Sequence, residues 1–277
     1  MTADQAPAPG DPGIRLLAVH AHPDDETLAT GVALAHHRLL DDEVHVITCT
    51  LGEEGEIIPP ELAHLEGSDQ LAPHRHTELM GAMQTLGVQH AYLGGERPRW
   101  RDSGMAGSAA AEHPRAFAGV DVTEPAGLLA EQVRAIAPDV VLTYDPHGGY
   151  GHPDHIQTHR VTVAALASLP APSRPALYVV LTPRSWVAQD RCWLAEHVPA
   201  DTPLTVPGPD DPCPPSVVPD DRVEHRLVAP EAVALRDAAL RHHRTQVSVH
   251  DGYYALSNDI AARLPDREGY TRWRDDH

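Results

Sequence analysis

Short runs of β-branched and apolar residues alternate with longer helical patterns along most of this 277-residue chain. The runs that predict strands cover residues 14–20, 44–50, 90–93, 140–144 and 177–182. The patterns that predict helices cover residues 27–40, 74–86, 122–137, 155–169 and 231–243. Repeated strand–helix alternation is typical of a mostly parallel sheet with helices on both faces. We therefore expect a Rossmann-like α/β fold, with its active site in the loops at the carboxyl ends of the strands.

Several segments fall outside this alternation. Residues 1–13 are rich in Pro, Ala and Gly and predict a flexible tail, so that residues 14–277 form a single domain. Residues 94–119 are too long for a neutral connection and predict a functional loop. The proline-rich insertion at 199–222 predicts an exposed extended segment, with a lid as the alternative. The charged C-terminal residues 266–277 are expected to be solvated.

The charge balance excludes several classes of partner. The 40 acidic residues outnumber the 21 basic ones, and the resulting net charge of −19 disfavours nucleic acid and membrane surfaces as partners. No apolar run is long enough to span a bilayer, and the N-terminus lacks the pattern of a secretory signal. Every basic residue is Arg, which excludes Schiff-base chemistry and a P-loop lysine. The three scattered cysteines, Cys49, Cys192 and Cys213, predict a reducing, cytoplasmic location.

Metal-ligand residue types gather after two of the predicted strands. The loop after residues 14–20 contains His22-Pro-Asp24-Asp25-Glu26, and it lacks the glycines of a dinucleotide-binding loop. The loop after residues 140–144 contains Tyr150-Gly-His152-Pro-Asp154-His155. Histidine and carboxylate are the ligands of hydrolytic zinc sites.

If the two strands are neighbours in the sheet, their loops meet. His22 and Asp25 from one loop and His155 from the other would then make a three-ligand site with a position left for water, as catalytic zinc requires. The alternative is that Asp24 and Asp25 only cap the following helix and the histidines are incidental. Repetition of a His-Pro-Asp sequence at both loops favours the metal site. Such a donor set also accepts Fe²⁺ or Co²⁺.

The AHPDDE loop and the later GHPDH resemble the PIG-L/LmbE-like zinc-dependent deacetylases. The segments TCTLGEEGE, RWRDSGMAG, TYDPHGGYGHPDH and ALSN are similar to the branch of that family that acts in mycothiol biosynthesis. The resemblance covers about residues 14–264. It implies a zinc-dependent N-deacetylase, an amidohydrolase acting on linear amides, with one Zn²⁺ per chain. The implied substrate is a small amino-sugar inositol, 1D-myo-inositol 2-acetamido-2-deoxy-α-D-glucopyranoside, whose acetamide is hydrolysed to acetate and a free amine.

Residue by residue, the resemblance implies a role for each member of the two loops. The metal ligands fall on His22, Asp25 and His155, and the general base falls on Asp24. The remaining implied catalytic residues are His152, which stabilises or protonates the tetrahedral intermediate, Tyr150, which polarises the carbonyl, and Asp154, which orients His152. The positions that hold the sugar and inositol hydroxyls fall on Arg75 and Asp102. Without the resemblance, Arg75 would be taken for a solvated helix residue and Asp102 for a loop residue with local hydrogen bonds.

Three other functions remain as alternatives. The nearest is a mycothiol S-conjugate amidase or another N-acetylglucosamine-type deacetylase of the same family. Such amidases tend to have Lys immediately before the first helix glycine, where this chain has Thr30, and that favours the biosynthetic deacetylase. A catalytically dead sugar-binding homologue is disfavoured because every implied catalytic group is present. A nucleotide-binding oxidoreductase is disfavoured because no G-x-G-x-x-G follows the first strand. The oligomeric state is not indicated by the sequence.

Overall fold

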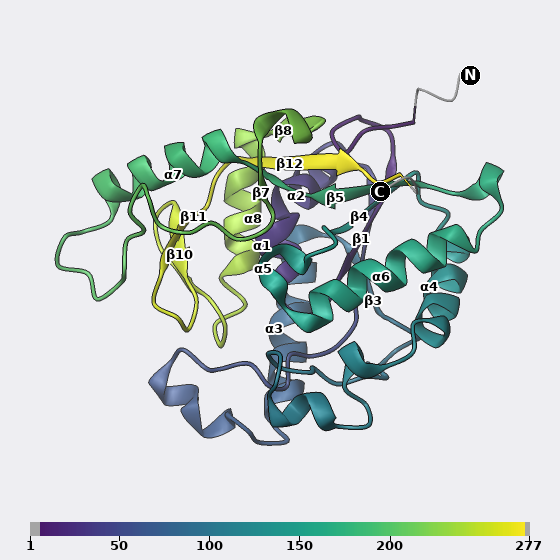
Figure 1. The fold of residues 1–277 in the computed structure, drawn as a ribbon, viewed down its shortest axis with the longest axis horizontal. Helices are drawn as coiled ribbons and strands as arrows, with labels where there is room; N and C mark the ends of the chain where they lie inside the picture. Colours follow the sequence, from purple (N-terminus) through teal and green to yellow (C-terminus); the bar gives the residue numbers. More distant parts are fainter. Residues whose placement is uncertain (1–5, 275–277) are drawn as a thin grey trace.

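A seven-stranded sheet with the order β3-β2-β1-β4-β5-β12-β8 forms the centre of the computed structural model, which describes residues 6–274 (Figure 1). Its strands are β1 (Arg15–His20), β2 (Glu43–Thr48), β3 (Gln89–Tyr92), β4 (Val140–Tyr144), β5 (Ala176–Val180), β8 (His225–Val228) and β12 (Arg267–Arg272). The helices are α1 (Asp25–Ala29), α2 (Gly31–Leu39), α3 (Leu71–Leu86), α4 (Thr123–Ile136), α5 (Gly148–Gly151), α6 (Pro153–Ala167), α7 (Arg184–His197) and α8 (Val233–Leu240).

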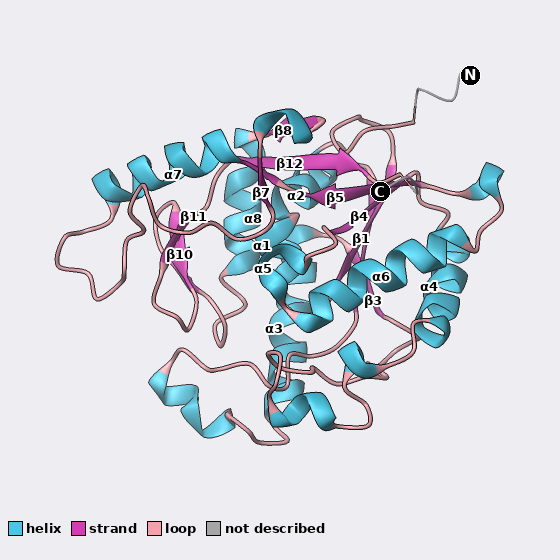
Figure 2. Ribbon diagram, viewed as in Figure 1, coloured by secondary structure: helices cyan, strands magenta, loops and turns pink. Residues whose placement is uncertain are grey.

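The sheet is buried on both faces because apolar side chains point to each side of its central strands. In β1, Leu16 and Ala18 pack with α2, α3 and α8, whereas Leu17 and Val19 pack with α4 and α6. All four side chains have no exposed surface. Figure 2 shows the same layering, with α4 and α6 together on one side of the strands. The predicted α/β fold with helices on both faces is confirmed.

The strand order reverses between β1 and β4. The chain runs from β1 outward to β2 and β3, then returns to place β4 on the other side of β1, with all five strands from β3 to β5 parallel. Leu16 pairs with Val140 and Ala18 with Leu142. The two strands that precede the His-Pro-Asp loops are therefore neighbours, and both loops leave the sheet at the point where ligands bind in folds of this kind.

Two predicted elements differ from the structure. The helix expected over 27–40 is two helices, α1 and α2, because Thr30 adopts a non-helical conformation and its side chain bonds to the Glu26 carbonyl. The C-terminal segment is not simply solvated, because β12 pairs antiparallel with β5 and β8. Glu268 and Tyr270 within it are buried, and the Glu268 carboxylate accepts hydrogen bonds from the backbone of α2. Residues 275–277 of that prediction lie outside the described residues.

The predicted tail and insertion also have contacts in the structure. Within the described part of the tail, the Pro7 carbonyl accepts a hydrogen bond from Tyr178, and the Pro9 carbonyl contacts His37. Residues 6–13 therefore lie against the fold, whereas residues 1–5 are outside the described residues. The proline-rich insertion contains β7 (Val217–Val218), which pairs with β6 (Thr182–Pro183). A separate three-stranded sheet consists of β9 (Ser248–Val249), β10 (Tyr253–Ala255) and β11 (Ala261–Arg263).

Candidate metal centre and active site

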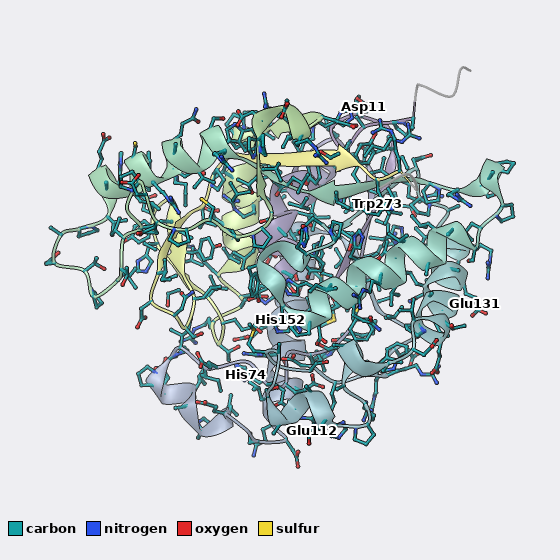
Figure 3. All side chains as sticks on the ribbon, viewed as in Figure 1. Asp11, His74, Glu112, Glu131, His152 and Trp273 are labelled. Atoms are coloured by element: carbon teal, nitrogen blue, oxygen red, sulfur yellow. The ribbon has the colours of Figure 1, made fainter. Side chains whose placement is uncertain are left out.

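A cavity of about 420 Å³ lies at the carboxyl ends of β1 and β4. Both His-Pro-Asp loops line it, and His152 lies near the middle of the molecule in Figure 3, at the start of α6. Eight of the nine predicted site residues line the cavity: His22, Asp24, Asp25, Arg75, Asp102, Tyr150, His152 and His155. The ninth, Asp154, is fully buried beside His22. The fold therefore brings all nine residues, from four separate segments, to one place.

Three donor atoms form a triangle with equal sides. His22 Nδ1 lies 3.3 Å from Asp25 Oδ2, His155 Nε2 lies 3.3 Å from the same oxygen, and the two nitrogens are 3.3 Å apart. A tetrahedral zinc ion with bonds of about 2.0–2.1 Å keeps its ligands about 3.3–3.4 Å apart. The donor types and their spacing therefore fit a four-coordinate metal with three protein ligands and one open position.

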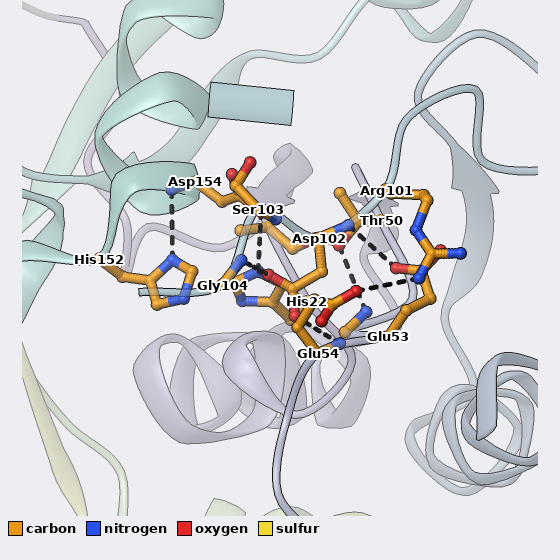
Figure 4. Close-up of polar contacts among 12 residues, drawn as sticks. His22, Thr50, Glu53, Glu54, Arg101, Asp102, Ser103, Gly104, His152 and Asp154 are labelled. Carbon is orange, nitrogen blue, oxygen red and sulfur yellow. Dashed lines mark hydrogen bonds and ion pairs between the residues drawn. The ribbon is translucent and has the colours of Figure 1, made fainter. Parts of the chain in front are cut away.

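The second nitrogen of each histidine has a partner that fixes the ring. His22 Nε2 lies 3.3 Å from Asp154 Oδ2 and 3.4 Å from Asp102 Oδ1 (Figure 4). His155 Nδ1 lies 3.2 Å from the Gly148 carbonyl. Burial lowers the pKa of His22, but Asp102, Asp154 and Asp25 outweigh burial and raise that pKa well above its usual value. A bound metal would displace the proton of the inner nitrogen of each ring, and the outer acceptors would hold the remaining proton, so that the nitrogen in the triangle offers a lone pair.

The turn that carries the Gly148 carbonyl requires glycine. Gly148 has φ +62°, and a Cβ there would lie 2.7 Å from His155 Cβ and 2.8 Å from the backbone nitrogen of Ile156. Asp145 also fixes this turn, because its carboxylate accepts hydrogen bonds from the backbone N–H groups of His147 and Gly149. Gly148 thus allows the chain to pack closely against the ligand histidine.

The two adjacent aspartates have opposite environments. Burial raises the pKa of Asp25, but the His155 and His22 rings outweigh burial and leave that pKa well below its usual value. Burial and the neighbouring Asp25 carboxylate raise the pKa of Asp24 well above its usual value. Asp25 is therefore held as a carboxylate in the donor triangle, whereas Asp24 lines the cavity as a carboxyl group that binds a proton readily.

The surroundings of His152, at the start of α6, favour the neutral form of its ring. Burial and the nearby His22 and His155 rings lower its pKa to about 4. Its Nδ1 accepts the backbone N–H of Asp154 at 3.2 Å, which places the proton of the neutral ring on Nε2. Asp154 contacts His152 through its backbone N–H, whereas its carboxylate Oδ2 bonds to His22 and to the backbone N–H of Ser103. Asp154 thus orients His22.

Tyr150, in the same loop, lines the cavity with 56% of its surface exposed. Its ring meets the His155 ring edge-on at 5.2 Å between centroids.

Arg75 and Asp102 are buried, with exposures of 2% and 4%. The Arg75 guanidinium donates to the carbonyls of Gly52 and Glu56, so its default interpretation as a solvated residue is wrong. Asp102 accepts the N–H groups of Gly104 and Glu54 at 2.8 and 3.2 Å. Both side chains therefore fix the loops that line the cavity, and Asp102 also faces His22.

Sequence reasoning missed several residues that support the donor triangle. The Tyr144 hydroxyl accepts the Ala21 N–H at 2.9 Å, and its ring stacks on His155 with centroids 4.2 Å apart. Its position as the last residue of a buried strand was the available signal. Glu26 contacts His243 in a buried pair, and Gln246 bonds to Pro23. These two contacts come from a segment more than 200 residues away, and no local pattern indicates them.

The fold and the donor triangle define an α/β protein with a candidate metal site where the strand order of its sheet reverses, between β1 and β4. A family model described as PIG-L, GlcNAc-PI de-N-acetylase, matches residues 17–166. The chain belongs to the PIG-L family, as its resemblance predicted.

Two curated relatives are named 1D-myo-inositol 2-acetamido-2-deoxy-α-D-glucopyranoside deacetylase. The one from Streptomyces scabiei is 45% identical, with 95% of this chain and 87% of the relative covered. The one from Thermomonospora curvata is also 45% identical, with 93% and 89% covered. A solved structure of the zinc-inhibited form of teicoplanin deacetylase has a TM-score of 0.56 at 17% identity, with 95% of this chain and 100% of that chain covered. The likeness to this solved structure supports the fold.

Proposed function

We propose that this protein hydrolyses the acetamide of 1D-myo-inositol 2-acetamido-2-deoxy-α-D-glucopyranoside, releasing acetate and the free amine in mycothiol biosynthesis. The observation that carries the proposal is the donor triangle of His22, Asp25 and His155 in a cavity of about 420 Å³. Two relatives at 45% identity bear the name of this activity. We assign the protein to the reducing cytoplasm, since Cys49, Cys192 and Cys213 are all free.

The triangle holds one metal ion per chain, and zinc fits it best because its bond lengths match the ligand spacing. When bound, the ion lowers the pKa of water and polarises a carbonyl oxygen. Asp25 supplies the negative charge of the ligand set, and Asp154 and Asp102 orient the His22 ring. Iron(II) is the alternative metal, because a His₂Asp donor set accepts both.

The remaining residues move protons and stabilise charge. Asp24 lines the cavity, where it accepts a proton from the attacking water and returns it to the departing amine. The amine must be protonated as it departs, because an amide anion is a very poor leaving group. The Nε2–H of neutral His152 and the Tyr150 hydroxyl both line the cavity and are placed to stabilise the developing oxyanion.

The substrate rings bind on the side of the cavity that Arg75 and Asp102 line. The Arg75 guanidinium donates hydrogen bonds to the carbonyls of Gly52 and Glu56. It therefore acts on the substrate chiefly by holding the loop that carries these two residues. Both of these loop residues line the cavity themselves. Asp102 can accept a hydroxyl hydrogen bond beside His22.

Acetate release from the inositol conjugate by the purified chain tests the proposal. The chain stripped of metal should be inactive, and one equivalent of Zn²⁺ should restore turnover. Stoichiometric acetate and free amine are the expected products. A metal-loaded chain that releases neither product contradicts the proposed function.

A second candidate function, cleavage of a bulkier amide such as a mycothiol S-conjugate, is favoured by one observation. A cavity of about 620 Å³ adjoins the first, and both are lined by Leu28, Ala29, Val180, Thr182 and Pro214. This second cavity gives room for an acyl group larger than acetyl. Turnover of such a conjugate compared with the acetylated substrate, as a ratio of kcat/KM values, decides which amide is preferred.

A further inference from the structure

The backbone of Asp24 has a conformation that residues with a side chain rarely adopt. Its φ is 101° and its ψ is −35°, a combination that favours glycine and persists elsewhere only where the surroundings fix it. This turn separates the roles of two adjacent residues. Asp24 lines the cavity, while Asp25 begins α1 and places its Oδ2 in the donor triangle.

Hydrogen bonds fix the peptide groups on both sides of Asp24. The preceding carbonyl, of Pro23, accepts a hydrogen bond from Gln246 Nε2 at 2.6 Å. The Asp24 N–H donates to Glu26 Oε2 at 3.0 Å. The Asp24 carbonyl accepts from the N–H groups of Thr27 and Leu28 at 3.0 and 2.9 Å. The first helical turn explains the last two bonds, but the first two depend on side chains.

Glu26 is itself held by a buried pair. Its Oε1 accepts the Thr27 hydroxyl at 2.6 Å and contacts His243 Nε2 at 2.9 Å. Glu26 and His243 both have no exposed surface. A buried ion pair adds little net stability compared with apolar side chains of similar volume. The clearest structural effect of the Glu26–His243 pair is to fix the Glu26 carboxylate, whose Oε2 accepts the hydrogen bond from the Asp24 N–H.

His243 and Gln246 come from one segment, residues 241–247, between α8 and β9. Thr245 in that segment donates to the Glu78 carboxylate of α3 through its N–H and its hydroxyl, at 2.9 and 2.6 Å. The segment is therefore anchored to the main body of the fold. From this anchor it contacts the loop after β1 at Pro23 and the first turn of α1 at Glu26.

We propose that Glu26, His243 and Gln246 are positioning residues that hold the backbone of Asp24 and thereby aim its carboxylate at the reacting water. The inference rests on the proposed function, in which Asp24 is the base. It assigns to the segment 241–247 a part in the chemistry, although that segment supplies none of the three donor atoms of the triangle.

The test combines substitutions of these residues with Asp24→Asn. E26L removes the acceptor of the Asp24 N–H, and Q246L removes the donor to Pro23. Each should lower kcat, E26L by about 10²-fold because small misplacements of a reacting group have effects of this size. Zinc content should stay at one per chain. E26Q should lose less, because its amide oxygen can still accept the Asp24 N–H. H242A, at the exposed histidine beside His243, is the matched control and should keep the parent rate.

The decisive comparison is the double-mutant cycle. If Glu26 and Gln246 act through the Asp24 carboxylate, E26L and Q246L should change kcat less than about twofold when Asp24 is already Asn. A general loss of stability would instead lower the rate by the same factor in both backgrounds, and additive losses overturn the proposal. Loss of zinc in folded E26L also overturns it, since Glu26 would then support the ligands. If E26L does not fold, Q246L and E26Q decide the cycle.

Crystal structures of the same variants give a second readout that needs no turnover. Asp24 should leave its positive φ in E26L and Q246L and keep it in H242A. A positive φ retained in both variants overturns the proposal. If the parent with zinc releases no acetate, the proposed function fails, and the backbone of Asp24 still shows whether these residues hold it.

Discussion

The two parts of the chain contribute differently to the cavity. Residues 14–180, which include the parallel strands β1 to β5, supply all three atoms of the donor triangle and the predicted base. Residues 182–274 supply a wall of the cavity, through Thr182, Pro214, Ser216, Gln246, Tyr254, Leu256 and Ser257. The family model ends at residue 166, within the first part. The reactive groups are thus concentrated in the regular part of the fold.

This difference follows from how each part is built. A strand end fixes the direction of the next few residues, so His22 and Asp25 can face one point from a single short loop. The wall is formed by turns and two small sheets, where side chains from distant segments meet. The reacting groups therefore come from few residues of the first part, residues 241–247 of the second part are proposed to position one of them, and substrate preference depends on both parts.

The largest effect is expected from His155→Ala. Removing Nε2 opens the donor triangle, so zinc should be lost and the rate should fall by at least about 10³-fold, because the metal supplies the Lewis acid. Metal content per chain and acetate release are measured on the same sample. His147→Ala, at an exposed histidine of the same loop, is the control and should keep both. Tight binding of one zinc with normal turnover in His155→Ala would remove His155 from the site.

Asp24→Asn separates the base from the ligands within the same loop. Asn has the size of Asp but does not accept a proton, so kcat should fall about 10²- to 10⁴-fold while zinc stays bound. The measurement is kcat together with metal content, and Asp25→Asn serves as the comparison, since it should weaken zinc binding. Loss of zinc from Asp24→Asn would mean that the two aspartates exchange or share their roles.

The first part of the molecule could be predicted from the sequence because its signals are local. The alternation of buried runs and helical patterns gives the parallel strands, and the two His-Pro-Asp sequences lie in the connections that follow β1 and β4. Neighbouring strands then bring His22, Asp25 and His155 together. The partners of the Asp154 carboxylate have no local signal, because Ser103 comes from a loop 51 residues away and His22 from a loop 132 residues away.

The second part could not be predicted in the same way. Strand β12 contains Arg267 and Glu268, whose charges predict solvent exposure. In the structure Arg267 pairs with Asp190 of α7, and Glu268 accepts the N–H groups of Val32 and Ala33. These partners are distant in sequence. Hydrophobic periodicity records burial against apolar neighbours, and it does not record a charge that is satisfied in the tertiary structure.

Arg75→Ala tests how one loop of the first part, the loop that carries Gly52 and Glu56, selects the substrate. Free N-acetylglucosamine lacks the inositol ring, so its kcat/KM should be well below that of the inositol conjugate in the parent. Arg75→Ala should lower kcat/KM for the conjugate by about 10- to 100-fold, because hydrogen bonds from a charged donor are lost. It should affect N-acetylglucosamine less, and so narrow the gap. Equal kcat/KM values for the two substrates in the parent would contradict the mycothiol assignment and leave the metal centre intact.

The two parts should also differ in how their buried or half-buried histidines make the free energy of unfolding depend on pH. In the first part, burial lowers the pKa of His90 to about 4, and its Nε2 contacts the Thr48 hydroxyl. The contribution of neutral His90 to the free energy of unfolding is fully present above about pH 6.5, the pKa of histidine in the unfolded chain. It is lost as the pH falls toward 4, by at most about 3 kcal/mol. In the second part, Glu26 outweighs burial and raises the pKa of His243. That stabilisation is present below about pH 6.5 and is lost as the pH rises through the raised value.

Urea unfolding between pH 4 and 8 measures both effects. His90→Gln should reduce the loss of unfolding free energy on acidification, because a side chain that does not titrate carries no such linkage. His243→Gln should change the slope in the opposite sense, with its largest effect above pH 6.5. His113→Gln, at an exposed histidine, should follow the parent curve. If His90→Gln and His243→Gln changed the slope in the same direction, the two histidines would not differ in protonation state, and the contrast between the two parts would not extend to them.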